Sequence, residues 1–202
     1  RSEINFQTST EKIINGYQKA GAVALSILTE KNFFNGSNYD ITNVRKITEL
    51  PILRKDFIID EFQVLESKSI GADGILLIAA CLDKKQIIKL SRLAKSLDLE
   101  VLIEIHDLSE LDNCCIDSVD IIGVNNRNLM TFNVDIETSI SLSSKIPRNY
   151  VKISESGISN PNDIITLKNF GYDGFLIGEN FMKTKDPGRA LENFLNEIKN
   201  DC

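Results

Sequence analysis

Short, almost continuous apolar runs alternate with amphipathic segments along the chain. The apolar runs have the character of strands buried on both faces, and they cover residues 22–28, 51–55, 74–78, 100–105, 121–124, 150–154 and 174–177. The segments between them predict helices at residues 10–20 (capped by Thr8 or Thr10), 41–50 (capped by Asp40), 61–70, 84–97 (capped by Asp83), 108–116, 136–145, 161–170 (opened by Asn160-Pro161) and 187–199, with a loop at 29–38. This alternation predicts one α/β domain over residues 1–202 with a parallel sheet.

An internal repeat supports a chain built from similar strand-and-helix units. Ile70-Gly71-Ala72-Asp73-Gly74 resembles Phe170-Gly171-Tyr172-Asp173-Gly174, and in each copy a helix end and an acidic turn lead into a buried strand. Two architectures fit, an open doubly wound sheet and a closed (βα)8 barrel. The first would place a GxGxxG pattern after its first strand, and the sequence has none there. The barrel is therefore favoured.

Polar side chains gather where the predicted strands end, as a barrel with its chemistry at one mouth requires. They are Lys55, Glu104, Asn125 with Arg127, and Glu155 with Ser156. Beside Leu53 and Phe57, Lys55 would lose water and its pKa would fall toward neutrality, which would make it a usable general acid. The alternative for Lys55-Asp56 is a solvated turn. His106 could act as a base, but we expect a structural or surface role.

Glycines follow the last two strands, at Gly157 and at Gly178-Glu179. Glycine lets backbone N–H groups approach a phosphate, so these turns are candidates for a phosphate cradle, with the Glu179 side chain pointing away. The alternative interpretation is that both segments are simply tight turns without a ligand. Phe34 and Phe57 could clasp a flat ring at the mouth, or could simply fill the core.

Composition excludes several classes of function. The formal net charge of −6 disfavours a nucleic-acid or anionic-membrane surface, and no apolar run approaches the length of a membrane span. The four cysteines are Cys81, Cys114, Cys115 and Cys202, and with one histidine and no CxxC pair they do not predict a metal site. We expect a cytoplasmic protein with reduced thiols that acts without a metal or another cofactor.

Taken together and in order, these motifs resemble indole-3-glycerol-phosphate synthases. The resemblance runs through nearly the whole chain and rests on Leu25-Ser26-Ile27-Leu28-Thr29-Glu30, Phe34-Asn35-Gly36-Ser37, Leu53-Arg54-Lys55-Asp56-Phe57, Ile103-Glu104-Ile105-His106, Gly123-Val124-Asn125-Asn126-Arg127-Asn128-Leu129, Ser154-Glu155-Ser156-Gly157-Ile158 and Ile177-Gly178-Glu179. It implies a (βα)8 barrel that acts in tryptophan biosynthesis on a small phosphorylated molecule, 1-(2-carboxyphenylamino)-1-deoxyribulose 5-phosphate. We expect a monomer or a weak homodimer.

The resemblance also implies a role for each candidate residue. Lys55 would be the general acid and Glu104 the partner base in dehydration. Asn125, Arg127, Glu155 and Ser156 would hold the sugar hydroxyls and support the acid–base pair. The phosphate cradle would be formed by Gly157, Gly178 and Glu179, and the slot for the anthranilate ring by Phe34 and Phe57.

One departure from the family pattern concerns the start of the chain. The family's first strand carries a glutamate and a lysine and is followed by a Ser-Pro-Ser loop, of which Arg1-Ser2 would be the tail. We therefore expect that an N-terminal helix and the first strand precede Arg1. Two alternative functions stay open: phosphoribosylanthranilate isomerase, which would use a cysteine/aspartate pair, and a non-catalytic barrel that binds a phosphorylated ligand.

Overall fold

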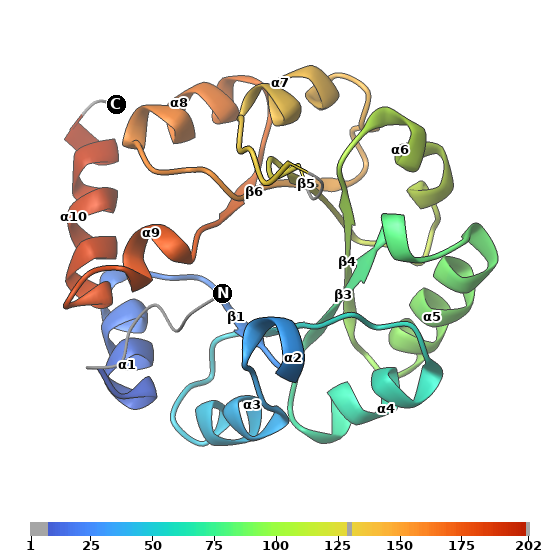
Figure 1. Ribbon diagram of the computed structural model, residues 1–202, viewed down its shortest axis with the longest axis horizontal. Coiled ribbons are helices and arrows are strands. Elements are labelled where there is room, and N and C mark those ends of the chain that lie inside the picture. The colour runs from blue at the N-terminus through green and yellow to red at the C-terminus, as the bar shows by residue number, and fades with distance from the viewer. Residues whose placement is uncertain (1–7, 129–130, 201–202) are drawn as a thin grey trace.

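Seven parallel strands form one curled sheet. The computed structural model describes residues 8–128 and 131–200. The strands are β1 (Leu25–Leu28), β2 (Ile52–Lys55), β3 (Gly74–Ile78), β4 (Glu100–Ile105), β5 (Ile121–Asn125), β6 (Val151–Glu155) and β7 (Gly174–Leu176), and each pairs with the next in chain order. All seven predicted strands are confirmed. Because the order is sequential and the sheet curves around an axis, the arrangement is that of a barrel wall and not of a doubly wound sheet (Figure 1).

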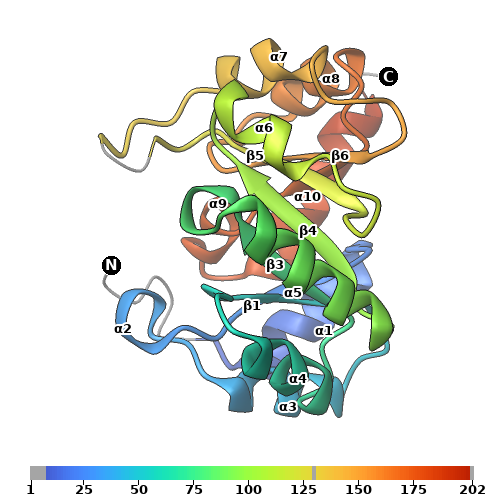
Figure 2. The same ribbon diagram turned by 90° about the vertical axis from the view of Figure 1, so that its right-hand side faces the viewer.

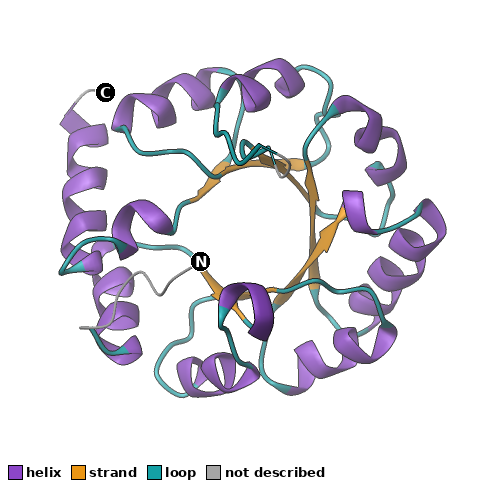
Figure 3. Ribbon diagram, in the orientation of Figure 1, coloured by secondary structure: helices purple, strands orange, loops and turns teal. Residues whose placement is uncertain are grey.

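Helices surround the strands, and most of them form an outer layer, as Figure 3 shows by its colours. They are α1 (Thr10–Ala20), α2 (Lys31–Phe34), α3 (Asn38–Arg45), α4 (Glu61–Ser69), α5 (Lys84–Ser96), α6 (Leu108–Cys114), α7 (Glu137–Ser143), α8 (Pro161–Asn169), α9 (Glu179–Met182) and α10 (Pro187–Asn200), with a short 3-10 turn at Ala79–Cys81. The predicted caps at Asp83 and Asn160 are confirmed, each as a reciprocal capping box.

Three local predictions near the start of the chain are wrong. The hydroxyl of Ser9, and not that of Thr8 or Thr10, caps α1 by accepting from the N–H of Lys12. Ser37 caps α3 in place of Asp40, which lies in the first turn, and the helix ends at Arg45 instead of residue 50. The predicted loop at 29–38 contains the short helix α2, because the Glu30 carboxylate accepts from three successive backbone N–H groups.

Side chains alternate between the two sides of the barrel wall. Leu76, Ile78 and Leu102 pack together inside it, and a larger buried cluster fills the space between the strands and the outer helices. On β2 the inner positions are Leu53 and Lys55, whereas Arg54 faces α4. Figure 2 shows that α2 and the loop after β5 project from the same end of the barrel, where the strands end.

The ring of strands is open between β7 and β1, since no pairing among the described residues joins them (Figure 1). The outer layer bridges this side through α1 and α10, which cross at Gly16 and Gly188. A Cβ on Gly188 would lie 2.6 Å from the Cα of Gly16, so only bare backbones allow this approach. The predictions for Arg1-Ser2, Leu129 and Cys202 concern residues that lie outside the described ranges.

None of the helices in the described part of the chain is both long enough and apolar enough to cross a bilayer.

Candidate active site

Lys55 lies at the centre of the barrel mouth between two buried carboxylates. Its ammonium Nζ is 3.0 Å from Oε2 of Glu104 and 3.0 Å from Oε2 of Glu155. The three side chains come from β2, β4 and β6, which are alternate strands of the wall and so point inward at a common level. Glu104 is 4% exposed and Glu155 is 1% exposed. The predicted cluster of strand-end residues is thus brought together across about a hundred residues of sequence.

The prediction that the pKa of Lys55 falls is wrong. Burial does oppose its charge, but attraction from Glu155 and Glu104 prevails and raises the pKa of Lys55 well above its ordinary value. Burial likewise works against ionised Glu104, yet Lys55 and the neighbouring side chains of His106 and Asn125 hold its pKa well below its usual range. The site therefore contains a firmly protonated amine and a firmly ionised carboxylate in contact.

Glu155 differs from Glu104 because its environment favours the proton. Burial raises the pKa of Glu155, Lys55 opposes that shift, and the nearby charge of Glu104 adds to it. Its Oε1 is buried without a hydrogen-bond partner among the described residues. The same oxygen sits over Gly123, where a Cβ would lie only 2.3 Å away. The two carboxylates that share Lys55 thus have pKa values pushed in opposite directions.

Two further side chains orient Glu104. The amide Nδ2 of Asn125 donates to Oε1 of Glu104 over 2.9 Å. His106 lies with Nε2 3.3 Å from Glu104 and Nδ1 3.4 Å from Glu110, at ion-pair distance but without hydrogen-bond alignment. Burial disfavours its charge, but these two carboxylates raise the pKa of His106 above its ordinary value. His106 is therefore a half-buried neighbour of the centre and not a surface residue.

Arg127 connects the loop after β5 with the segment after β7. Its Nη2 is 3.2 Å from Oε2 of Glu179, and its backbone N–H donates to the side chain of Asn125 over 3.0 Å. The Glu179 carboxylate is thereby turned toward Arg127. Gly178 precedes α9, and a Cβ there would meet nothing within 4 Å, so open space adjoins this turn.

Ser156 and Gly157 form the turn after β6, and both have positive φ, at 68° and 74°. At Gly157 the requirement for glycine is also steric, because a Cβ would lie 2.1 Å from Val134. The amide of Asn180 in α9 donates to the carbonyl of Ser159 over 3.4 Å and so links the turn after β6 to the turn after β7. The two predicted glycine turns are thus tied together at one part of the mouth.

Phe34 and Phe57 are neighbours, but they do not clasp. Their ring centroids are 5.8 Å apart with planes 10° from parallel, so the rings stack on each other. A third ring between them would need a separation of at least about 7 Å, twice the contact distance of carbon atoms. Phe33 adds an edge-on contact to Phe57 at 6.0 Å. The aromatic residues therefore form one apolar wall and not two jaws.

Asn126 is a buried residue beside the site that was not predicted from the sequence. Asn126 is 2% exposed and its amide donates to the Ser154 hydroxyl and the Ser156 carbonyl. Its Oδ1 accepts from the N–H and the hydroxyl of Ser139. The buried Arg54 was not predicted either, although a charged residue within an apolar strand is a signal for it. No cluster of three or more possible metal ligands occurs among the described residues.

The family model described as "Indole-3-glycerol phosphate synthase" matches residues 1–194. The indole-3-glycerol phosphate synthase of Bacteroides thetaiotaomicron is 49% identical over 196 residues, which cover 97% of this chain and 75% of the relative. The protein of that name from Thermoanaerobacter sp. (strain X514) is 48% identical over 188 residues, which cover 93% and 72%.

Solved structures of low identity share the fold alone. The 3-hexulose-6-phosphate synthase of Salmonella typhimurium superposes with a TM-score of 0.74 at 17% identity and covers 92% of each chain. A mutant tryptophan synthase α-subunit from Pyrococcus furiosus superposes with a TM-score of 0.72 at 14% identity and covers 95% of this chain and 91% of that one. From the family model and the curated relatives, this chain belongs to the indole-3-glycerol phosphate synthase family.

Proposed function

We propose that this protein converts 1-(2-carboxyphenylamino)-1-deoxyribulose 5-phosphate into indole-3-glycerol phosphate, acting as a carboxy-lyase in tryptophan biosynthesis. Family membership supports the reaction. The single observation that carries the mechanism is the contact of Lys55 Nζ with both Glu104 and Glu155 at the barrel mouth. No comparison favours the isomerase or the non-catalytic barrel.

The reaction requires a proton donor, a proton acceptor and a site that excludes water. The ring carbon that bears the carboxylate attacks the ribulose carbonyl, whose oxygen takes a proton from Lys55. Carbon dioxide then leaves and its bonding electrons restore the aromatic ring. Before the final dehydration Lys55 regains a proton from solvent. It then donates to the hydroxyl, which departs as water, while Glu104 takes the proton that the new double bond releases. Transfer of that proton from Glu104 to Lys55 restores both groups.

The opposite pKa shifts of the two carboxylates suit these roles. Glu104 has a depressed pKa, so it is ionised and can accept a proton, whereas burial raises the pKa of Glu155. Two carboxylates also keep Lys55 protonated before each turnover. Substrate oxygens that displace one carboxylate would weaken this hold and make the ammonium a stronger acid.

The remaining candidate residues are proposed to bind substrate. The turns at Gly157 and Gly178-Glu179 would hold the phosphate by backbone N–H groups, with the Glu179 carboxylate turned away toward Arg127. Asn125, Arg127 and Ser156 would hold the sugar hydroxyls. The anthranilate ring would lie against the wall formed by Phe34 and Phe57. The partner is thus a small phosphorylated molecule, and we propose that the enzyme works in the cytoplasm without a metal or cofactor.

Product fluorescence provides a direct test because the chain contains no tryptophan. The full-length protein should generate indole fluorescence from the anthranilate-ribulose substrate, and Lys55→Ala should abolish it. Lys95→Ala is a matched control, since Lys95 also lies between two carboxylates, Glu100 and Asp120, but at the opposite ends of the strands. Lys95→Ala should keep the rate per folded molecule.

Two results would overturn the proposal in different ways. If the folded wild-type protein forms no indole product, the proposed reaction is wrong. If the rate is unchanged in Lys55→Ala, the proposed reaction stands but Lys55 is not its general acid.

A further inference from the structure

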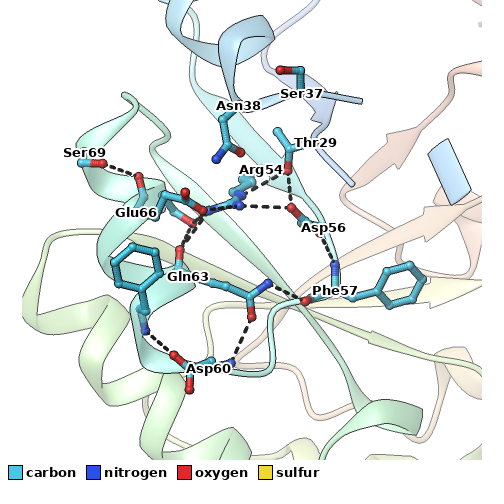
Figure 4. A network of polar contacts seen from close by, with 12 residues as sticks. Thr29, Ser37, Asn38, Arg54, Asp56, Phe57, Asp60, Gln63, Glu66 and Ser69 are labelled. Atoms are coloured by element: carbon cyan, nitrogen blue, oxygen red, sulfur yellow. Dashed lines mark hydrogen bonds and ion pairs between the residues drawn. The ribbon is translucent and has the colours of Figure 1, made fainter. Parts of the chain in front are cut away.

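Arg54 is a fully hydrogen-bonded buried cation directly beside Lys55. It is 3% exposed and lies on the outer face of β2. Its Nε donates to the Thr29 hydroxyl over 3.1 Å, and Nη1 donates to the Gln63 carbonyl over 3.0 Å and to the Ser67 hydroxyl over 3.1 Å. Its Nη2 is 3.1 Å from Asp56 and 2.8 Å from Glu66 (Figure 4). All three nitrogens are therefore engaged.

The contacts of Arg54 continue to the aromatic wall of the site. The Thr29 hydroxyl, which accepts from Arg54, donates to Oδ2 of Asp56 over 2.5 Å. Oδ1 of Asp56 accepts from the backbone N–H of Phe57 over 2.8 Å. On the other side, the Gln63 amide donates to the carbonyl of Phe57 over 2.9 Å (Figure 4). Both backbone polar groups of Phe57 are thus held by this network.

The network also fixes the backbone on both sides of Lys55. Residues 54 and 56 are anchored outside the barrel, and strand alternation directs the residue between them inward. A lysine side chain has four rotatable carbons, so its ammonium reaches two carboxylates at 3.0 Å only if its Cα is held steadily. An error of about 1 Å in a catalytic group can cost a hundredfold in rate.

We propose that Arg54 is a positioning residue, which acts with Thr29, Asp56 and Gln63 to aim Lys55 and to seat Phe57. This inference rests on the proposed function for the role of Lys55, and it assigns to Arg54 no contact with substrate. The planar fork of an arginine can serve five acceptors from α4 and from the turns that follow β1 and β2, whereas a lysine has three donors on one atom. The positive charge alone is therefore not enough.

The test compares two arginine-to-lysine variants on the same strand-and-helix unit. Arg54→Lys keeps the charge but loses the fork. Arg45→Lys is the matched control, because Arg45 binds the carbonyls of Thr48, Leu50 and Gly71 and pairs with Asp73 near the start of β2, far from Lys55. Thr29→Val is a milder, nearly isosteric change that removes the hydroxyl between Arg54 and Asp56. Each variant is assayed for kcat, KM and pH dependence, with the folded fraction measured by circular dichroism.

We expect Arg54→Lys to lower kcat per folded molecule by about 10- to 100-fold. It should also raise KM, because the backbone of Phe57 is held less firmly. Thr29→Val should change kcat and KM in the same directions to a smaller extent. The alkaline limb of the pH profile should move to lower pH, because an ammonium held less closely by its carboxylates loses its proton sooner. Arg45→Lys should lower stability while kcat, KM and the pH profile stay at wild-type values.

A readout without turnover separates this inference from the proposed function. In 15N NMR spectra, the ammonium of Lys55 should give a slowly exchanging signal that is absent in Lys55→Arg. Arg54→Lys should broaden or shift that signal, and Arg45→Lys should not. If the signal and the kcat per folded molecule both stay unchanged in Arg54→Lys and Thr29→Val, the positioning role is overturned. If wild-type protein is inactive but the signal responds as expected, the proposed reaction fails and the positioning role stands.

Discussion

The carboxylate of Glu155 occupies the space that a side chain at Gly123 would fill. An ideal Cβ on Gly123 would lie 2.3 Å from Oε1 of Glu155 and 3.0 Å from Cδ1 of Leu102. Gly123 belongs to β5 and Glu155 to the neighbouring strand β6, and the register of these two strands is fixed by backbone pairing from Ile121 to Asn125. The absence of a side chain on one strand therefore determines where the carboxylate of the next strand can lie.

Gly123→Ala should displace Glu155 from Lys55. We expect the free energy of unfolding to fall by about 1–3 kcal/mol, the usual cost of overpacking, and kcat to fall at least about tenfold because a catalytic group moves. Denaturant unfolding and steady-state kinetics measure the two effects.

Glu155→Asp provides the control for that experiment, since the shorter side chain relieves the clash. In Gly123→Ala/Glu155→Asp the stability losses should be less than additive. Additive losses would mean that the methyl group acts elsewhere.

Lys55→Met should cost about 3–5 kcal/mol at neutral pH because it leaves two buried carboxylates without their cation. Wild-type Glu104 has a depressed pKa, so its contribution to stability is present above the ordinary glutamate pKa of about 4.3 and is lost as pH falls through the folded value. The difference between wild type and variant should therefore shrink from pH 5 to pH 2. Unfolding curves at both pH values would show this, and a deficit that does not change with pH would contradict it.

The His106 ring should titrate above the ordinary histidine pKa of about 6.5, because Glu104 and Glu110 favour its charge. Its stabilisation is then complete below the unfolded pKa and is lost as pH rises through the higher folded pKa. His106→Gln should accordingly lose more stability at pH 6 than at pH 9. His106 is the only histidine in the sequence, so its ring protons can be followed by NMR without assignment of others. A midpoint below 6.5 would disprove the expectation.

Asn125 and Asn126 are adjacent but should respond differently to substitution. Asn126→Ala removes the acceptor of the buried Ser139 N–H and the donor to the Ser156 carbonyl, and we expect a loss of about 2–4 kcal/mol in stability. Asn125→Ala removes a donor to Glu104, so it should chiefly lower kcat. Measurement of kcat and unfolding in both variants tests the contrast. Equal effects of the two substitutions on stability would argue against it.

The strands and the meeting of Lys55, Glu104 and Glu155 could be predicted from the sequence, because buried apolar runs between glycine turns mark parallel strands and a barrel brings their ends together. The direction of the pKa shift of Lys55 could not. It depends on two carboxylates converging on one amine, and only the register across β2, β4 and β6 shows that. The stacking of Phe34 on Phe57 could not be predicted either. Phe34 lies in α2, a short helix that is fixed by the Glu30 side chain within a segment predicted to be a loop.

The crossing of α1 and α10 at two bare backbones has a consequence for the whole frame. Gly16 and Gly188 set the distance between α1 and α10. The circumference of the outer ring of helices is therefore fixed here by helix packing and not by hydrogen bonds between β7 and β1. Even a methyl group at either glycine would push α1 and α10 apart and widen the ring of helices between β7 and β1. The inward aim of side chains on distant strands would then shift, although no residue near the mouth had been altered.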